Sequence, residues 1–128
     1  MLIHLKKGER IYINGAVLRF DRKTSVEFLN DVSFLLEDYV MQVDEAVTPF
    51  QKLYLTIQTM LIDPHNATLS RELYKHLSYN LRVTSGGGGG ISLLDEIDEH
   101  VLGGRYFSAL KILRRGMAGE RSAAQTPS

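Results

Sequence analysis

Residues 5–20 read LKKGERIYINGAVLRF, and we expect the rest of the chain to fold around this stretch. Its centre, Asn14-Gly15, lies between two β-prone runs, Ile11-Tyr12-Ile13 and Ala16-Val17-Leu18. Asn-Gly is a strong hairpin signal because a type I′ turn needs positive φ at both central residues. The cations that flank this turn are Lys6, Lys7, Arg10 and Arg19. The stretch therefore predicts both a fold nucleus and a place for an anionic partner.

The first 41 residues contain further short β-prone segments separated by polar breaks. Besides the hairpin, the candidate strands are residues 1–5, 25–29 and 33–36. Four or five short strands joined by tight turns predict a small antiparallel meander. Such a sheet buries one face, and the helices expected downstream would cover that face. The fold class that we expect is therefore α+β, with about four α-helices packing on the meander.

Residues 49–83 have the apolar spacing of two amphipathic helices. Thr48-Pro49 predicts the start of the first, with Thr48 as N-cap and Pro49 at the first helical position. Asp63-Pro64 predicts its end, because the residue before proline avoids the α region. The second helix is expected from 66–70 to about 83, with a buried stripe formed by Leu69, Leu73, His76, Leu77 and Asn80 or Leu81.

Residues 91–115 predict a further helical hairpin. The two helices are expected over 91–102 and 105–115, and Gly103-Gly104 separates them as glycine does after a helix. Residues 49–83 and 91–115 would together form the helical part, and residues 1–41 the β-rich part, of one domain over 1–115. The small and polar residues 116–128 are expected to form a disordered tail.

Gly86 to Gly90 form an uninterrupted glycine run, which disfavours helix and strand alike. We expect a flexible link over residues 85–90. The run is consistent either with an engineered link in place of a natural segment or with a natural low-complexity loop. No Gly-Lys-Ser/Thr follows it, which argues against a phosphate-binding loop.

The composition is that of a globular protein without thiol chemistry. Hydrophobic residues make up 44% and charged residues 23% of the chain, and cysteine is absent, which excludes disulfides. No apolar run reaches the length of a membrane span, and the early cations interrupt any signal-peptide core. We therefore expect a cytoplasmic protein that does not enter the membrane.

The formal net charge is zero, but the charges are segregated along the chain. Residues 1–24 hold six cations and two anions, whereas residues 25–48 hold six carboxylates and no Lys or Arg. A basic block attracts phosphate and an acidic block repels it, although each block can equally be a solvated face. The N-terminal block is thus the first place to look for a nucleic-acid interface.

The sequence holds no recognisable catalytic constellation. Its four histidines are scattered, no cysteine is available as a nucleophile, and no Gly-x-Ser-x-Gly motif is present. Glu96 and His100 lie one helical turn apart and could share a metal ion, but a solvated acidic helix face is the simpler interpretation. We expect no enzyme, no catalytic residue, no metal ion and no cofactor.

The residues that we expect to bind RNA are Lys6, Lys7, Arg10, Tyr12, Arg19, Arg22 and Lys23. Cations hold phosphates, and aromatic rings on a wet sheet face stack unpaired bases. If Ile11 and Ile13 face the core, alternation along the strand puts Tyr12 on the open face with Arg10. The other interpretation is that Tyr12 covers a sheet edge or packs against a helix.

The string KKGERIYINGAVLRF, residues 6–20, resembles the N-terminal signature of the FlbT family of flagellar biosynthesis regulators. Later blocks fit that family in order, so that the resemblance covers residues 2–115: Thr48-Pro49, Lys52-Leu53-Tyr54, Asp63-Pro64 and Gly104 to Lys111. The glycine run departs from the family pattern, whose members usually carry ordinary residues before the last helix pair.

The resemblance implies post-transcriptional control of flagellin synthesis. Family members are associated with the 5′ leader of flagellin messenger RNA and usually reduce its translation and lifetime. The alternative is a protein-binding adaptor or chaperone-like partner of flagellin or of the companion regulator FlaF, with indirect effects on the messenger RNA. The modest basic excess favours this alternative. The RNA recognised, the sign of regulation and the oligomeric state do not follow from the sequence.

Overall fold

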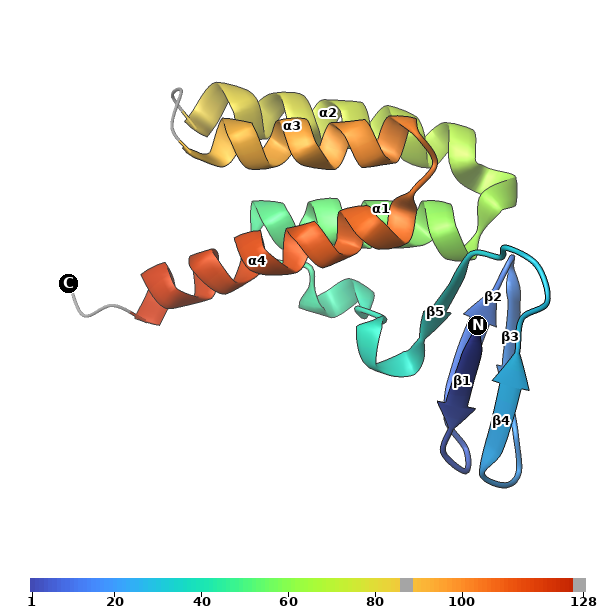
Figure 1. Ribbon diagram of the computed structural model, residues 1–128. Coiled ribbons are helices and arrows are strands. Elements are labelled where there is room, and N and C mark those ends of the chain that lie inside the picture. Colours follow the sequence, from blue (N-terminus) through green and yellow to red (C-terminus); the bar gives the residue numbers. More distant parts are fainter. Residues whose placement is uncertain (86–88, 126–128) are drawn as a thin grey trace.

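The computed structural model describes residues 1–85 and 89–125 and has an α+β fold. A β-rich half comes first and a helical half follows it, as the sequence predicts (Figure 1). Five strands form the β-rich half: β1 (Leu2–Leu5), β2 (Arg10–Ile13), β3 (Ala16–Arg19), β4 (Thr24–Glu27) and β5 (Phe34–Leu36). The helical half consists of α1 (Pro49–Ile62), α2 (Ala67–Ser85), α3 (Gly89–Leu102) and α4 (Tyr106–Gln125). Short 3-10 turns lie at Glu37–Tyr39, Val43–Glu45 and Pro64–Asn66.

The predicted Asn-Gly hairpin joins β2 to β3. Ile13 pairs with Ala16, and the two turn residues have φ values of 47° at Asn14 and 89° at Gly15. Positive φ at both positions is the signature of the type I′ turn. The turn abuts the end of α1, since a Cβ atom on Gly15 would lie 3.9 Å from the Ile62 carbonyl oxygen. The hairpin is therefore fixed against the helical half at its turn end.

The strands pair as two small antiparallel sheets, a different arrangement from the meander expected. β1 pairs with β4, and β2 lies between β3 and β5 in the second sheet. Leu5 and Ile11 are 1% and 0% exposed and form the buried centre of the β-rich half. On the other face of β2, Tyr12 lies beside Leu35, which belongs to the helical core. Both faces of β2 are therefore covered, which a one-layer meander would not achieve.

Local signals set the ends of α1 as predicted. The Thr48 side chain accepts a hydrogen bond from the Gln51 backbone N–H at 3.2 Å, and the Gln51 side chain accepts one from the Thr48 N–H at 3.0 Å. This capping box spans the first turn, with Pro49 at the first helical position, and the helix ends before Asp63. α1 packs against α2 and α4, and it carries the largest share of the buried core, including Leu53, Tyr54 and Ile57.

α2 corrects one prediction about which of its faces is buried. The expected stripe is largely exposed, since Leu69 and Leu73 expose 76% and 52% of their surface and His76 and Asn80 are also exposed. Of the expected stripe, Leu81 is buried and Leu77 is partly buried against the core, and the other buried residues are Ser70, Tyr74 and Ser78. Small serines allow close approach to the neighbouring helices, and Tyr74 and Ser78 find polar partners on α3. Polar complementarity between helices has therefore decided the buried face.

The glycine-rich and C-terminal segments differ in part from expectation. α2 continues to Ser85 and α3 begins at Gly89, so only residues 86–88 of the expected link lie outside the described residues. α4 continues to Gln125, which corrects the prediction of a disordered tail from residue 116, and residues 126–128 lie outside the described part. Polar composition alone does not end a helix, and residues 116–125 contain no proline. Gly104, with φ of 74°, ends α3 as predicted.

Candidate nucleic-acid interface

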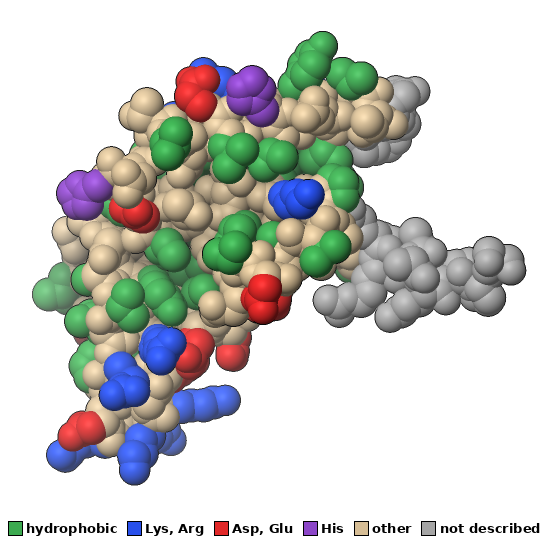
Figure 2. Space-filling model, turned by 180° about the vertical axis from the view of Figure 1, so that it is seen from behind, with side chains coloured by type: hydrophobic (Ala, Val, Ile, Leu, Met, Phe, Trp, Pro, Cys, Tyr) green, Lys and Arg blue, Asp and Glu red, His purple; other side chains and the backbone are tan. Residues whose placement is uncertain are grey.

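Six of the seven residues predicted to bind RNA gather at one end of the β-rich half. Figure 2 shows Lys and Arg side chains gathered at one end of the molecule. We call this group the basic tip, and it consists of Lys6, Lys7, Arg10, Arg19, Arg22 and Lys23, all of which are exposed. Two turns bring these residues together, because the Gly8 N–H donates to the Phe20 carbonyl oxygen at 2.9 Å. The β1–β2 and β3–β4 loops thus lie side by side.

Most cations of the basic tip have no carboxylate partner. Lys6, Lys7, Arg19 and Lys23 make no ion pair with any residue that the structure describes. Arg22 pairs with its neighbour Asp21 at 3.6 Å, and both side chains are more than four-fifths exposed. Such an exposed pair contributes little free energy, so the Arg22 guanidinium stays available to a partner in solution. The tip therefore presents uncompensated positive charge.

Two arginines face each other across the hairpin. In the register of β2 and β3, Arg10 pairs directly with Arg19. Like charges in directly opposed positions destabilise a sheet, by about 0.2–1 kcal/mol. Glu37 offers partial compensation, with an oxygen 3.9 Å from Arg10 Nε, but both side chains are about half exposed. An anion placed between the two guanidinium groups would relieve this repulsion.

Tyr12 does not lie on an open sheet face, which corrects the prediction made from strand alternation. It is half-buried and packs against the helical core, opposite Leu35 of β5. Alternation does separate Tyr12 from Ile11, but helices cover the side that was expected to be wet. Tyr12 therefore offers no ring to an unpaired base, and the alternative interpretation, that it packs on the helical side, is confirmed.

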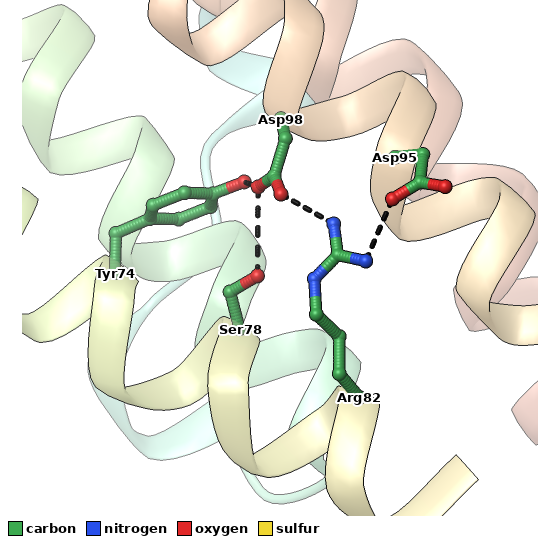
Figure 3. A network of polar contacts seen from close by, with 5 residues as sticks. All are labelled: Tyr74, Ser78, Arg82, Asp95 and Asp98. Atoms are coloured by element: carbon green, nitrogen blue, oxygen red, sulfur yellow. Dashed lines mark hydrogen bonds and ion pairs between the residues drawn. The ribbon is translucent and has the colours of Figure 1, made fainter. Parts of the chain in front are cut away.

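Sequence inspection missed a polar network between α2 and α3 (Figure 3). Asp98 accepts hydrogen bonds from the Tyr74 hydroxyl and, at 3.5 Å, from the Ser78 hydroxyl, and it forms an ion pair with Arg82. Arg82 also donates to Asp95 at 2.6 Å. Tyr74, Ser78 and Arg82 recur every four residues on α2, and this polar stripe was the signal that could have revealed the network. A groove of about 780 Å³ lies beside it.

The network shifts the pKa of two of its members. Burial, reinforced by the hydrogen bond to Asp98, raises the pKa of the Tyr74 phenol well above its ordinary range. Hydrogen bonds to Asp95 and Asp98 raise the pKa of the Arg82 guanidinium. Burial is thus the main cause of the Tyr74 shift, and the two carboxylates are the main cause of the Arg82 shift. The network is therefore an interhelical clamp rather than a reactive centre.

The raised pKa of Tyr74 predicts a loss of stability at alkaline pH. The unfolded phenol ionises near pH 10 whereas the folded one stays protonated, so each pH unit above 10 lowers the free energy of unfolding by about 1.4 kcal/mol through this residue. Tyr74→Phe should remove that part of the pH dependence. Urea unfolding of both proteins between pH 8 and 11 measures it. Equal losses in the two proteins would contradict the assignment, and the shared contributions of Tyr54 and the lysines cancel in the comparison.

The pair considered as metal ligands has other partners. Glu96 forms an ion pair with Arg115 at 3.6 Å, and His100 Nδ1 accepts a hydrogen bond from Arg105 Nε at 3.0 Å. Within the described residues, no group of three or more His, Cys, Asp or Glu side chains is placed to hold a metal ion.

None of the helices described is long and apolar enough to cross a membrane.

Comparisons with known proteins point to one family. The model of the family described as flagellar protein FlbT matches residues 1–123. A probable flagellum biosynthesis repressor protein FlbT of Chelativorans sp. (strain BNC1) is 45% identical over 88% of this chain and 77% of its own length. The protein of the same name in Mesorhizobium japonicum is 45% identical over 94% and 82%, and the FlbT 2 protein of Bradyrhizobium diazoefficiens is 46% identical over 89% and 84%. No solved structure matches the chain.

Proposed function

The chain belongs to the FlbT family of flagellar proteins, and on this premise we propose that it represses flagellum biosynthesis by binding RNA. Its curated relatives are named as probable repressors of that process. The proposed target is the 5′ leader of flagellin messenger RNA, in the cytoplasm, and binding lowers the translation or the lifetime of that message. The protein acts by occupying the leader and does not cleave it.

The opposed pair of Arg10 and Arg19 carries this proposal. A protein gains nothing in stability from two guanidinium groups in directly opposed positions, at the centre of six exposed cations. A phosphate between them turns the repulsion into two charge-assisted hydrogen bonds. Arginine also matches phosphate geometry better than lysine does, because its planar fork donates two parallel hydrogen bonds. The basic tip is therefore suited to a nucleic-acid backbone.

The absence of Tyr12 from the tip defines how the RNA is held. Without that ring, the tip grips phosphates rather than stacking bases, and phosphate contacts position a protein without reading sequence. Double-stranded RNA is recognised in this way, through the shape and the backbone of its A-form helix. We therefore propose that the basic tip binds the double-stranded stem of a leader stem-loop. The two protein loops at residues 6–9 and 20–23 would lie against the RNA backbone.

A titration of flagellin leader RNA with the purified protein tests this function. Binding through four to six phosphates predicts a log–log slope of affinity against salt of about −3 to −5, and thus a loss of about 60-fold to 1,000-fold between about 50 and 200 mM salt. A stem-free RNA of equal length serves as control and should bind more weakly. Absence of saturable binding at the lower salt concentration would refute the proposal.

A second candidate function is an adaptor that docks flagellin or FlaF, with indirect effects on the message. Two observations favour it: the packing of Tyr12 against the helical core, which makes the hairpin partly a scaffold, and the zero net charge of the chain. A protein–protein contact with an apolar centre is less sensitive to salt than phosphate binding. Binding of purified flagellin or FlaF that persists at high salt, without leader binding, would support the adaptor.

A further inference from the structure

The two-stranded sheet of β1 and β4 has one exposed face, which continues the surface of the basic tip. Side chains alternate along both strands, and the residues between the exposed ones are half-buried or buried. We call the exposed set the outer ribbon face, and it consists of Leu2, His4, Ser25 and Glu27. One register step beyond the pair of Leu5 and Thr24 come Lys6 and Lys23, at the end where both loops of the basic tip lie (Figure 1).

His4 and Ser25 form a polar pair in the middle of this face. They are directly opposed in the register, and His4 Nδ1 lies 2.9 Å from Ser25 Oγ. A hydroxyl can donate or accept a hydrogen bond, so this bond persists whether the imidazole is neutral or protonated. The bond occupies Nδ1 and leaves Nε2 without a hydrogen bond to any residue that the structure describes. Nε2 of an exposed and oriented ring is thus free to contact a partner.

We propose that the outer ribbon face extends the RNA surface of the basic tip, with His4 as a phosphate ligand that Ser25 orients. This inference rests on the function proposed above. At about 3.4 Å per residue, His4 lies about 7 Å farther along β1 than Lys6. The backbone of a nucleic acid is a continuous polyanion. A strand held by Lys6 and Lys23 that follows the ribbon therefore meets His4 next.

Protonation of His4 adds a cation in line with the two lysines. Histidine is the side chain whose charge ordinarily changes between about pH 5 and 8. The protonated ring donates from Nε2 to a phosphate oxygen, and such a charge-assisted hydrogen bond is stronger than one between neutral groups. The complex with RNA then holds a proton that the free protein holds less firmly, so RNA binding tightens as the pH falls.

The other charged groups around His4 set the limits of this surface. Toward the basic tip these groups are Lys6 and Lys23, and away from it they are Glu27 and the amino group of Met1, which donates to the Phe28 carbonyl oxygen. The lysines repel a charged His4 in the free protein, whereas phosphates bound to the lysines screen that repulsion. Glu27 repels phosphate, so the RNA surface ends at His4. His4 itself forms no ion pair with any residue of the described part.

Anisotropy titrations of flagellin leader RNA with the full chain at about pH 5.5 and 8 test the inference. The wild type should bind about tenfold more tightly at the lower pH. Its log–log slope against salt should also steepen there by about one, for one more neutralised phosphate. His4→Gln should abolish both differences and bind like the wild type at the higher pH. His76→Gln is the matched control, since His76 is an exposed histidine of α2, and this variant should keep both differences.

Substitutions of Ser25 test the orientation of the ring. Ser25→Ala should reduce the gain in affinity at low pH by about threefold, because the imidazole then loses the partner that fixes its rotamer. Ser25→Thr keeps the hydroxyl and suits a strand, so it should retain the full gain. Both positions are exposed, and circular dichroism should show an unchanged fold. A full gain in Ser25→Ala would overturn the orienting role of Ser25.

The outcomes separate this inference from the function on which it rests. Leader RNA that binds equally well at both pH values, or a gain at low pH that His4→Gln retains, would overturn the role of His4 and leave binding by the basic tip in place. Absence of binding at both pH values would overturn the inference together with the proposed function. A gain lost in His4→Gln and kept in His76→Gln would place His4 on the RNA surface.

Discussion

Replacing Asp98 by alanine is expected to lower the free energy of unfolding by about 2–3 kcal/mol. The buried Tyr74 hydroxyl would lose its acceptor, and the Ser78 hydroxyl would lose a weaker one. Arg82 would keep only Asp95, whose side chain is 65% exposed and holds it less firmly. The buried hydroxyl accounts for most of the loss, because the ion pair is partly exposed and screened by solvent.

Glu99→Ala provides the matched control for this substitution. Glu99 lies on the same helix, carries the same charge and is exposed, and its side chain forms no hydrogen bond or ion pair with the described residues. Urea unfolding of both variants should leave Glu99→Ala within about 0.5 kcal/mol of the wild type. Asp98→Asn separates the two contributions, since it keeps an acceptor for Tyr74 and loses the charge opposite Arg82. If Asp98→Ala were no less stable than Glu99→Ala, the clamp would contribute nothing to stability.

The parts of the fold that could be predicted from the sequence are those that short-range signals decide. Asn14-Gly15 forms its turn because these two residue types readily adopt the positive φ angles that the turn requires. Thr48-Pro49 and Asp63-Pro64 likewise define the ends of α1 through capping and proline sterics. The grouping of the cations also follows from sequence, because they lie in or beside turns at the same end of short strands.

The parts that could not be predicted depend on contacts between distant segments. Tyr12 and Ile11 could be assigned to opposite faces, but only the tertiary arrangement decides that the helical core covers one face and that Ile11 on the other face is buried as well. For α2, apolar spacing favours the face with Leu69 and Leu73 for burial. The structure buries the Tyr74 face because Asp98 on α3 matches its polar groups. The pairing of polar side chains between two helices cannot be read from the spacing of apolar residues along either helix alone.

The double substitution Arg10→Ala/Arg19→Ala is expected to lower the affinity for leader RNA by about a hundredfold at low salt. Each guanidinium–phosphate interaction contributes about 1.4 kcal/mol or more, and each such amount corresponds to a factor of ten. The salt slope should also become shallower by about two, one for each phosphate that an arginine no longer neutralises. A filter-binding or anisotropy titration at two salt concentrations measures both quantities.

Lys52→Ala/Arg71→Ala is the matched control for charge. Both residues are exposed cations of the helical half, so the control changes the net charge equally without altering the basic tip. Its affinity should fall by no more than about threefold, through the weaker long-range attraction alone. Equal losses in the two double variants would mean that RNA responds to net charge and not to the tip. A loss in the tip variant alone would locate the binding surface.

Arg19→Ala by itself separates binding from folding. It removes the like-charge opposition across the hairpin and leaves the ion pair between Arg10 and Glu37 intact. The free energy of unfolding should therefore stay unchanged or rise by a few tenths of a kcal/mol, while RNA affinity falls by about tenfold. Opposite signs for stability and affinity are typical of a residue kept for binding at a cost in stability. A fall in stability together with affinity would instead make Arg19 part of the scaffold, and the adaptor would become the better account of the hairpin.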